Sequence, residues 1–200
     1  MPKEILIIII VIIFIICLIL YKKKTNNTIN VKSDLDNENY LVQNLPQKSS
    51  AATTLSIIRK RIFILRDYLE KNIDSYPTYK PYIEQFIHRI NNLVLTENDP
   101  RGKYTSYTVN KGDKITLCLR SKKTEKLHDI NLIMYVVLHE LAHVACPEIN
   151  HTKLFKKIFI FFLKIASKLK IYQIKDYQID PTEYCGLIIN ENLLKFTKIY

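Results

Sequence analysis

The sequence predicts an α+β domain that follows an apolar N-terminal helix. Three observations carry this prediction. Residues 5–21 form an unbroken apolar run, residues 104–119 alternate like two strands joined by a turn, and residues 129–144 carry apolar side chains at helical spacing. A helical pattern beside a hairpin pattern indicates a mixed fold, and the roughly 150 residues of the C-terminal part are enough for one hydrophobic core.

The N-terminal run predicts a single-pass membrane anchor over residues 1–21. Ile5 to Tyr21 contains no glycine, proline or charge, and a helix of that length spans roughly 25 Å, close to the thickness of the hydrocarbon layer. A cleaved signal peptide would have a shorter apolar region and small residues at a cleavage site, whereas Lys22 to Lys24 follow here. By the positive-inside rule, these lysines place the rest of the chain on the cytosolic side.

Residues 22–51 are predicted to form a polar linker, because this stretch shows no sustained apolar periodicity. The folded domain is then expected over residues 52–200. Its first two helices are predicted over residues 54–69 and 81–95, where apolar residues recur every three or four positions. The hairpin and the third predicted helix follow them in the chain.

This third helix carries the residues on which the functional prediction depends. The segment HELAH occupies residues 139–143, so His139 and His143 lie one turn apart on the same face and can bind one zinc ion. Glu140 lies beside the first ligand and is predicted to be the general base that takes a proton from a metal-bound water. The structural alternative is a pair of solvent-facing histidines around a glutamate in a salt bridge.

Two histidines leave a catalytic zinc ion one protein ligand short. Pro147 disfavours helical geometry at Cys146 and therefore ends the helix, after which His151 opens the next helical pattern. Cys146 follows His139 by seven residues, roughly 10 Å along the helix axis, which is too far for both to bind one ion. His151 is therefore the predicted third ligand, and Glu148, which requires a tighter turn, is the alternative.

The cysteines and one glycosylation sequon indicate a reducing compartment without glycosylation. Cys17 lies in the predicted anchor, which leaves Cys118, Cys146 and Cys185, an odd number. We therefore predict free thiols rather than a disulfide framework. A glycan on Asn150, whose sequon includes the predicted third ligand, would crowd the metal.

The segment from His139 to Phe155 (HELAHVACPEINHTKLF) resembles the active-site segment of the WLM metallopeptidases, zincins related to the SprT-like proteases, in the form found in large DNA viruses. The resemblance extends to residues 107–120 and 180–186, and covers about the second half of the chain. In the cellular members the third histidine follows slightly sooner. The resemblance implies a zincin-like fold and a zinc-dependent endopeptidase that acts on polypeptides; some relatives cleave proteins crosslinked to DNA.

By the same resemblance, the hairpin of residues 104–119 supplies an edge strand that pairs with extended substrate. An ordinary structural hairpin is the alternative. Tyr177 or Tyr184 in the C-terminal tail is the candidate for stabilising the oxyanion that forms when a carbonyl is attacked. His128 is predicted to lie near a helix cap rather than near zinc.

The charge distribution predicts acidic partners. The chain has a formal net charge of +11, and residues 152–170 form an amphipathic pattern with a lysine-rich face. Anionic lipid, nucleic acid and DNA-bound protein all fit this excess. The sequence thus predicts a membrane-anchored zinc endopeptidase on the cytosolic or virion-interior side. The alternatives are a non-catalytic tethered module with a structural zinc, and a hydrolase with a non-protein substrate. The sequence predicts no oligomeric state.

Overall fold

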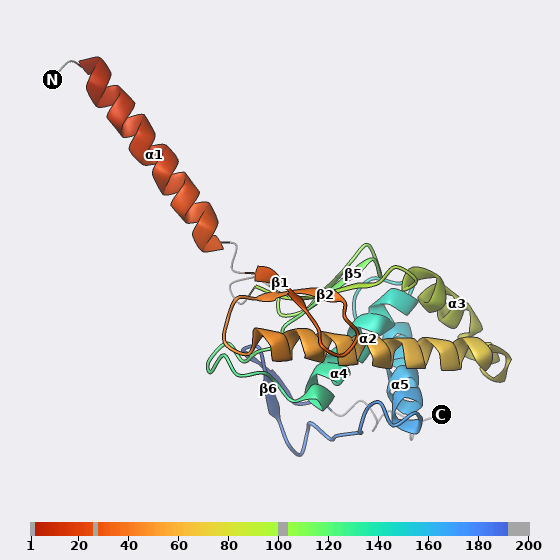
Figure 1. Cartoon of the computed structure of the whole chain (residues 1–200). Coiled ribbons are helices and arrows are strands. Elements are labelled where there is room, and N and C mark those ends of the chain that lie inside the picture. The colour runs from red at the N-terminus through yellow and green to blue at the C-terminus, as the bar shows by residue number, and fades with distance from the viewer. Residues whose placement is uncertain (1–2, 26–27, 100–103, 192–200) are drawn as a thin grey trace.

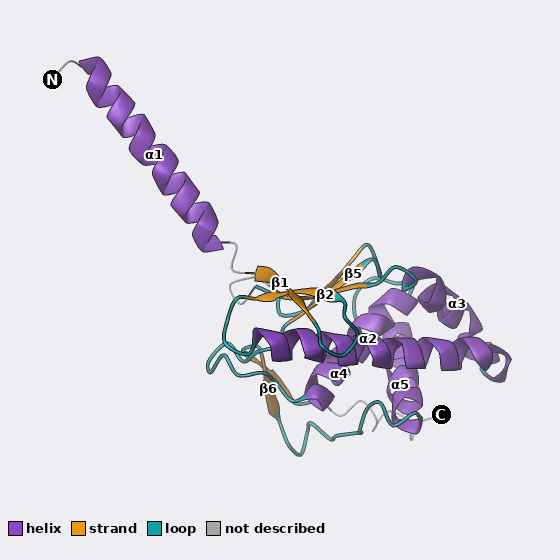
Figure 2. Ribbon diagram, in the orientation of Figure 1, coloured by secondary structure: helices purple, strands orange, loops and turns teal. Residues whose placement is uncertain are grey.

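A five-stranded sheet forms one layer of the domain, and helices pack on one of its faces (Figures 1 and 2). The computed structural model describes residues 3–25, 28–99 and 104–191. The mixed α+β fold agrees with the predicted class. The four helices of the domain and the two 3₁₀ turns have these bounds: α2 (Lys48–Lys71), η1 (Ile73–Ser75), η2 (Pro77–Tyr79), α3 (Lys80–Arg89), α4 (Ile130–Ala145) and α5 (Lys153–Lys168).

The sheet is mixed, with the strand order β1-β2-β3-β5-β4. The outer pairs, β1 with β2 and β4 with β5, are antiparallel, whereas β2 with β3 and β3 with β5 are parallel. The predicted hairpin is therefore present as β4 and β5, and β4 is the last strand of the sheet. The strand bounds are β1 (Thr28–Lys32), β2 (Asn39–Gln43), β3 (Val94–Glu97), β4 (Tyr107–Val109) and β5 (Lys114–Leu117).

The segment expected to be a linker contributes two strands to this sheet. Strands β1 and β2 pair in register from Thr28 with Gln43 to Lys32 with Asn39. Only one side chain in two of a half-buried strand needs to be apolar, and Tyr40 and Val42 fill those positions in the core. Such short strands among polar residues give no sustained periodicity. The folded domain consequently begins at Thr28, and not at residue 52.

A second difference concerns the segment predicted as a helix over residues 81–95. Helix α3 ends at Arg89, and residues 94–97 form β3, a central strand with parallel partners on both sides. Leu95 is buried from a position within β3, and Leu93 is buried from the loop directly before that strand. A short apolar run fits either periodicity, and here the tertiary contacts of the sheet decide the outcome.

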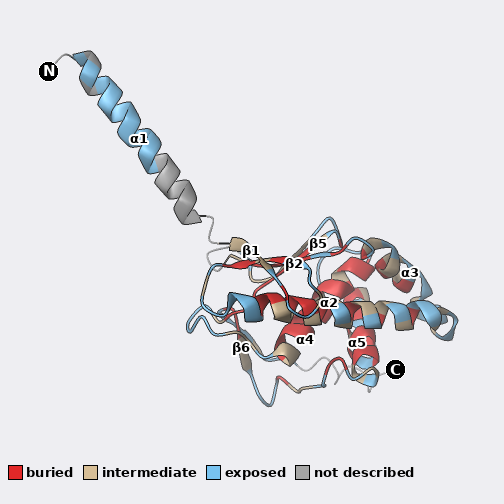
Figure 3. Ribbon diagram, viewed as in Figure 1, coloured by how far each residue is buried: buried red, intermediate tan, exposed pale blue. Residues whose placement is uncertain are grey.

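Helix α4 is the central element of the helical layer. It contacts α2, α3 and α5 as well as strands β4 and β5, and most of its side chains are buried (Figure 3). The Asp129 carboxylate caps its start by accepting hydrogen bonds from the backbone N–H groups of Asn131 at 2.8 Å and Leu132 at 3.3 Å. These contacts and the N-terminal cap fix the position of the HELAH segment.

Helix α1 (Lys3–Thr25) projects away from the domain (Figure 1) and contains most of the segment predicted as an anchor. Among the residues that the structure describes, no helix combines the length and the apolar character that a membrane span requires. Several large apolar side chains of α1 are nevertheless exposed (Figure 3). These are Ile5, Ile7, Ile8, Ile9, Ile10, Val11, Ile12, Ile13, Phe14, Ile15 and Ile16.

The prediction of free thiols is wrong for two of the cysteines. Cys118 and Cys185, which are 67 residues apart in sequence, form a disulfide, while Cys17 and Cys146 are free. The fold brings the C-terminal hairpin, β6 (Thr182–Tyr184) and β7 (Leu187–Ile189), against the end of β5. The number of cysteines in a sequence does not show which of them the fold brings together, so this long-range pair could not be predicted from the count.

Candidate metal centre and catalytic site

The three predicted metal ligands meet at one point. His139 and His143 project from the same face of α4, and both are half-buried. The Nε2 atom of His151 lies 2.9 Å from Nε2 of His139 and 3.2 Å from Nε2 of His143. The structure therefore brings together all three histidines that the sequence analysis selected.

The turn after α4 places the third histidine. Cys146 has extended geometry and ends α4 directly before Pro147. Asn150 then adopts a left-handed conformation with φ of 69°, and the Thr152 hydroxyl caps α5 by accepting a hydrogen bond from the backbone N–H of Phe155 at 3.2 Å. The chain thus reverses within six residues, and His151 lies over the face that carries the other two ligands.

The geometry of the cluster fits a tetrahedral metal ion. Zinc bound to imidazole nitrogens at about 2.0–2.1 Å would place those nitrogens about 3.3 Å from one another, close to the two separations observed. Burial and, to a smaller extent, the neighbouring histidines together lower the pKa of His139 to about 3 and that of His143 to about 4. Both rings are therefore neutral at physiological pH, which is the form that donates a lone pair to a metal.

Aromatic side chains of α5 hold the imidazole rings in place. Phe155 stacks on His143 with the ring centroids 4.1 Å apart, and meets the His139 ring edge-on at 4.9 Å. Phe159 also packs edge-on against His139, at 5.2 Å. These contacts restrict the rings before any ion binds, so the donor set is preorganised. The structure does not group Cys146 or Glu148 with this cluster.

Glu140 is buried next to the cluster. Its side chain is only 7% exposed, which excludes the alternative of a solvent-facing glutamate in a surface salt bridge. The carboxylate accepts a hydrogen bond of 2.9 Å from the hydroxyl of Thr108 on β4. Burial raises the pKa of Glu140 to about 7, and the Thr108 hydrogen bond opposes this increase. A carboxylate with this pKa can both take up and release a proton near neutral pH.

A cavity of about 540 Å³ opens onto these residues. His139, Glu140, His151 and Lys156 are among the residues that line it. Much of the remaining lining is apolar and comes from α4, α5 and β7; it comprises Tyr135, Val136, Phe155, Phe159, Leu187, Ile188 and Ile189. A concave and largely apolar site with a few convergent polar groups is the usual form of a substrate-binding site.

The structure distinguishes the two tyrosines proposed as oxyanion donors. Tyr184 lines the cavity, and its hydroxyl lies 2.7 Å from the Ser106 hydroxyl. Tyr177 is buried away from the cavity and packs on Tyr135 with the ring centroids 4.8 Å apart. Thr108 and Ser106 are site residues that the sequence analysis missed. The available signal was their position in the hairpin of residues 104–119, which by resemblance to zincins was expected to border the cleft.

A mixed α+β fold, three convergent histidines and a buried glutamate on the helix that carries two of these histidines are the features of a metallopeptidase-type domain. The WLM-domain family model matches residues 85–164 of the chain, a segment that includes all four of these residues. The predicted class therefore has independent support from the sequence of the whole segment.

Several proteins of large DNA viruses are similar to this chain. An uncharacterized protein of Acanthamoeba polyphaga mimivirus is 66% identical over 165 residues, which are 82% of this chain and 84% of that protein. A protein of Invertebrate iridescent virus 6 is 44% identical over 69 residues, which are 34% of this chain and 38% of that protein. The chain belongs to the WLM-domain family, in the form found in large DNA viruses.

Among solved structures, Wss1 from Saccharomyces cerevisiae matches the fold with a TM-score of 0.49 and 22% sequence identity, over 65% of this chain and 88% of that chain. A Wss1 variant from S. pombe matches with a TM-score of 0.43 and 22% identity, over 62% of this chain and 91% of that chain.

Proposed function

We propose that the protein is a zinc-dependent endopeptidase whose metal ligands are His139, His143 and His151 and whose general base is Glu140. The observation that carries the proposal is the convergence of the three Nε2 atoms beside a buried carboxylate at the wall of one cavity. Three protein ligands leave a fourth position open, which is the arrangement of catalytic rather than structural zinc sites.

Each residue has a defined role in this reaction. A zinc ion held by the three histidines would supply Lewis-acid activation of a water molecule and of the scissile carbonyl. Glu140 takes the proton of the attacking water and delivers it to the leaving amine, a transfer that its pKa of about 7 favours in both directions. The Tyr184 hydroxyl, at the wall of the same cavity, is the proposed hydrogen-bond donor to the oxyanion that develops on the substrate.

The edge of the sheet offers a way to bind an extended polypeptide. Strand β4 is the last strand of the sheet, and Thr108 in its middle contacts Glu140. An edge strand exposes backbone N–H and C=O groups that pair with a substrate strand without selecting its side chains. The apolar cavity beside it would then receive one or two substrate side chains, which supports a preference for apolar residues near the cleaved bond.

The test compares the full-length wild type with Glu140→Gln on an unfolded protein substrate, with and without zinc. The variant keeps the shape of the carboxylate, so the metal content and melting temperature are expected to stay the same while cleavage falls at least about 1,000-fold. Cleavage by the variant at the wild-type rate would contradict the role of Glu140. A wild type that holds zinc but cleaves neither protein nor nucleic acid would instead favour a non-catalytic module.

We also propose that α1 attaches the domain to a lipid bilayer, with the domain on the cytosolic or virion-interior face. The exposed apolar side chains of α1 support the attachment, and Lys22 to Lys24, which follow them in sequence, support this orientation. In a vesicle-flotation assay, the full-length chain should float and a chain that starts at Thr28 should not. Equal flotation of both would assign membrane binding to the folded domain instead.

The lysine-rich face of α5 supports nucleic acid, or a protein bound to it, as a further partner. The exposed lysines on this helix are Lys153, Lys156, Lys157, Lys164 and Lys168. Phosphate contacts from such a face produce binding that weakens steeply with salt. Fluorescence polarisation with a DNA duplex at two salt concentrations tests this partner. Binding that is absent, or unchanged when Lys157 and Lys164 are replaced by glutamine, would contradict it.

A further inference from the structure

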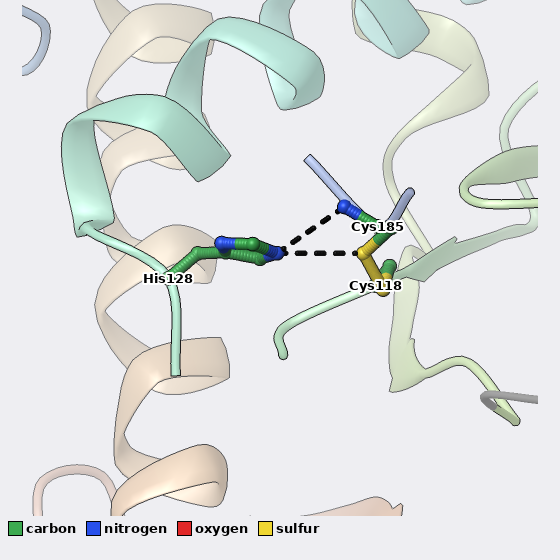
Figure 4. A group of neighbouring side chains, drawn as sticks. All are labelled: Cys118, His128 and Cys185. Atoms are coloured by element: carbon green, nitrogen blue, oxygen red, sulfur yellow. Dashed lines mark hydrogen bonds between the residues drawn. A yellow bond between two sulfur atoms is a disulfide. The ribbon is translucent and has the colours of Figure 1, made fainter. Parts of the chain in front are cut away.

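A second group of metal-ligating side chains lies outside the catalytic cavity. Cys118 follows β5, His128 precedes the cap of α4, and Cys185 lies in the turn between β6 and β7 (Figure 4). The two cysteines are buried and joined as a disulfide. The Nε2 atom of His128 is 3.6 Å from Sγ of Cys185, and the three ligand atoms lie within 4.8 Å of one another.

The turn that carries Cys185 is unusual for a cysteine. Tyr184 pairs with Leu187, so Cys185 and Gly186 form a two-residue turn, and both have positive φ, 53° and 86°. Asparagine, aspartate and glycine are the usual residues at these positions, because other side chains are strained there. A non-glycine residue in this conformation often serves a function, and here the conformation points the sulfur at Cys118 and His128 (Figure 4).

We propose that in the reduced protein Cys118, His128 and Cys185 bind a second zinc ion, and that the disulfide is the oxidised state of the same cluster. Two thiolates and one imidazole are a common donor set for zinc, with the fourth position left to water. The proposal does not depend on the protease activity, because none of the three residues belongs to the catalytic site.

The surroundings of the cluster suit both states. Burial lowers the pKa of His128, so its ring is neutral and its Nε2 atom can donate to a metal. Zinc–sulfur bonds of about 2.3 Å would hold the two sulfurs about 3.8 Å apart. The Cα atoms are 6.4 Å apart, which leaves room for the sulfurs to separate by side-chain rotation. The predicted cytosolic compartment keeps thiols reduced, and zinc is the expected occupant there.

The change of state can be written as a balanced exchange. A small disulfide such as oxidised glutathione accepts two electrons from the Cys118 and Cys185 thiolates. One sulfur–sulfur bond forms in the protein, two molecules of glutathione thiolate leave, and the zinc ion is released. His128 keeps its proton state, because it is neutral both as a ligand and beside the disulfide.

The cluster is coupled to the wall of the catalytic cavity. Cys185 directly follows Tyr184, whose ring packs on His128 with the centroids 5.2 Å apart. The Ser106 hydroxyl, which contacts the Tyr184 hydroxyl, also accepts a hydrogen bond from the backbone N–H of Cys118 at 3.2 Å. Either the zinc ion or the disulfide would therefore fasten the β6–β7 hairpin, one wall of the cavity, to the end of β5.

The test measures metal content and cobalt spectra of the full-length chain. Under a thiol-free reductant, we expect about two zinc ions per wild-type chain and about one in Cys118→Ser, since the three-histidine site remains. Cobalt(II) in place of zinc should produce a thiolate-to-cobalt charge-transfer band in the near ultraviolet. Three histidines cannot produce this band, so it reports on the second site alone.

Two controls make the result specific. Cys146→Ala removes the buried free cysteine that ends α4 and should leave the band and the zinc content unchanged. Oxidised glutathione added to the reduced wild type should abolish the band and release about one zinc ion per chain. Because this control uses the wild-type chain, its result does not depend on whether a variant folds. One zinc ion per reduced wild-type chain and no charge-transfer band would overturn the proposal.

Discussion

The Thr108 hydroxyl donates a hydrogen bond of 2.9 Å to the Glu140 carboxylate. This contact joins the edge strand, where a polypeptide would bind, to the residue that would move the proton. It is also the hydrogen bond that opposes the effect of burial on the pKa of Glu140. The position of the proposed substrate-binding strand and the protonation of the proposed base are therefore linked through one side chain.

Replacing Thr108 by valine should shift the pH dependence of cleavage to higher pH. Loss of the hydrogen bond removes stabilisation from the ionised carboxylate, so the pKa of Glu140 rises and a smaller fraction of the enzyme has an ionised base in acid. A rise of one pKa unit would lower kcat/KM about tenfold below neutral pH and leave the alkaline plateau nearly unchanged. A pH profile of kcat/KM measures this effect.

Thr108→Ser is the matched control, because it keeps the hydroxyl and should keep the wild-type profile. A uniform loss of activity at every pH in Thr108→Val would show instead that the side chain positions the strand and does not act on the base.

The metal site yields a second prediction. His151→Ala should weaken zinc binding more than about 100-fold, because two ligands remain of the three that converge. Glu148→Gln, a change at the alternative ligand, should leave the affinity unchanged. Competition with a chromogenic chelator measures both. A larger loss of zinc affinity in Glu148→Gln than in His151→Ala would show that Glu148, and not His151, is the third ligand.

The candidate site was more predictable than the fold around it. The spacing of His139 and His143 on one helical face and the helix end at Pro147 are local features, so the sequence alone is enough to select them. His151 could also be predicted, because the turn between the two helices is short and few of its residues can reach the face of α4 that carries His139 and His143. Thr108 and Ser106 reach the site through the pairing of distant segments, which no local pattern records.

The differences between the predicted and the observed fold have the same cause. Strand β1 is held in the sheet by pairing with β2, and its own sequence carries few apolar residues. Leu95 fits a helix by periodicity, but it pairs with Ile115 as a residue of β3. The pairing of Cys118 with Cys185 follows only from the way the C-terminal hairpin folds back on the sheet. In each case the deciding interaction spans a long stretch of sequence.

A buried ion pair between β3 and the end of β5 yields a prediction about stability. The Arg120 Nε atom lies 2.9 Å from Oε1 of Glu97, and both side chains are almost fully buried. Glu97→Gln would leave the guanidinium without its counter-charge, which typically costs about 3–5 kcal/mol. Urea denaturation of the full-length variant measures the loss. Asp74→Asn, which breaks the exposed pair with Lys80, should cause no measurable change.

The contrast between two tyrosines yields the last prediction. Tyr184→Phe removes the hydroxyl that lines the cavity and should lower kcat about 100-fold with little change in KM, because an oxyanion donor acts mainly in the transition state. Tyr177→Phe is the control. The Tyr177 side chain is buried and is not among the residues that line the cavity, so removal of its hydroxyl should leave kcat unchanged. Steady-state kinetics of both variants, together with their melting temperatures, separate the roles. Equal kcat and KM values in Tyr184→Phe and the wild type would show that the Tyr184 hydroxyl does not stabilise the oxyanion. A higher KM at unchanged kcat would show instead that Tyr184 binds substrate.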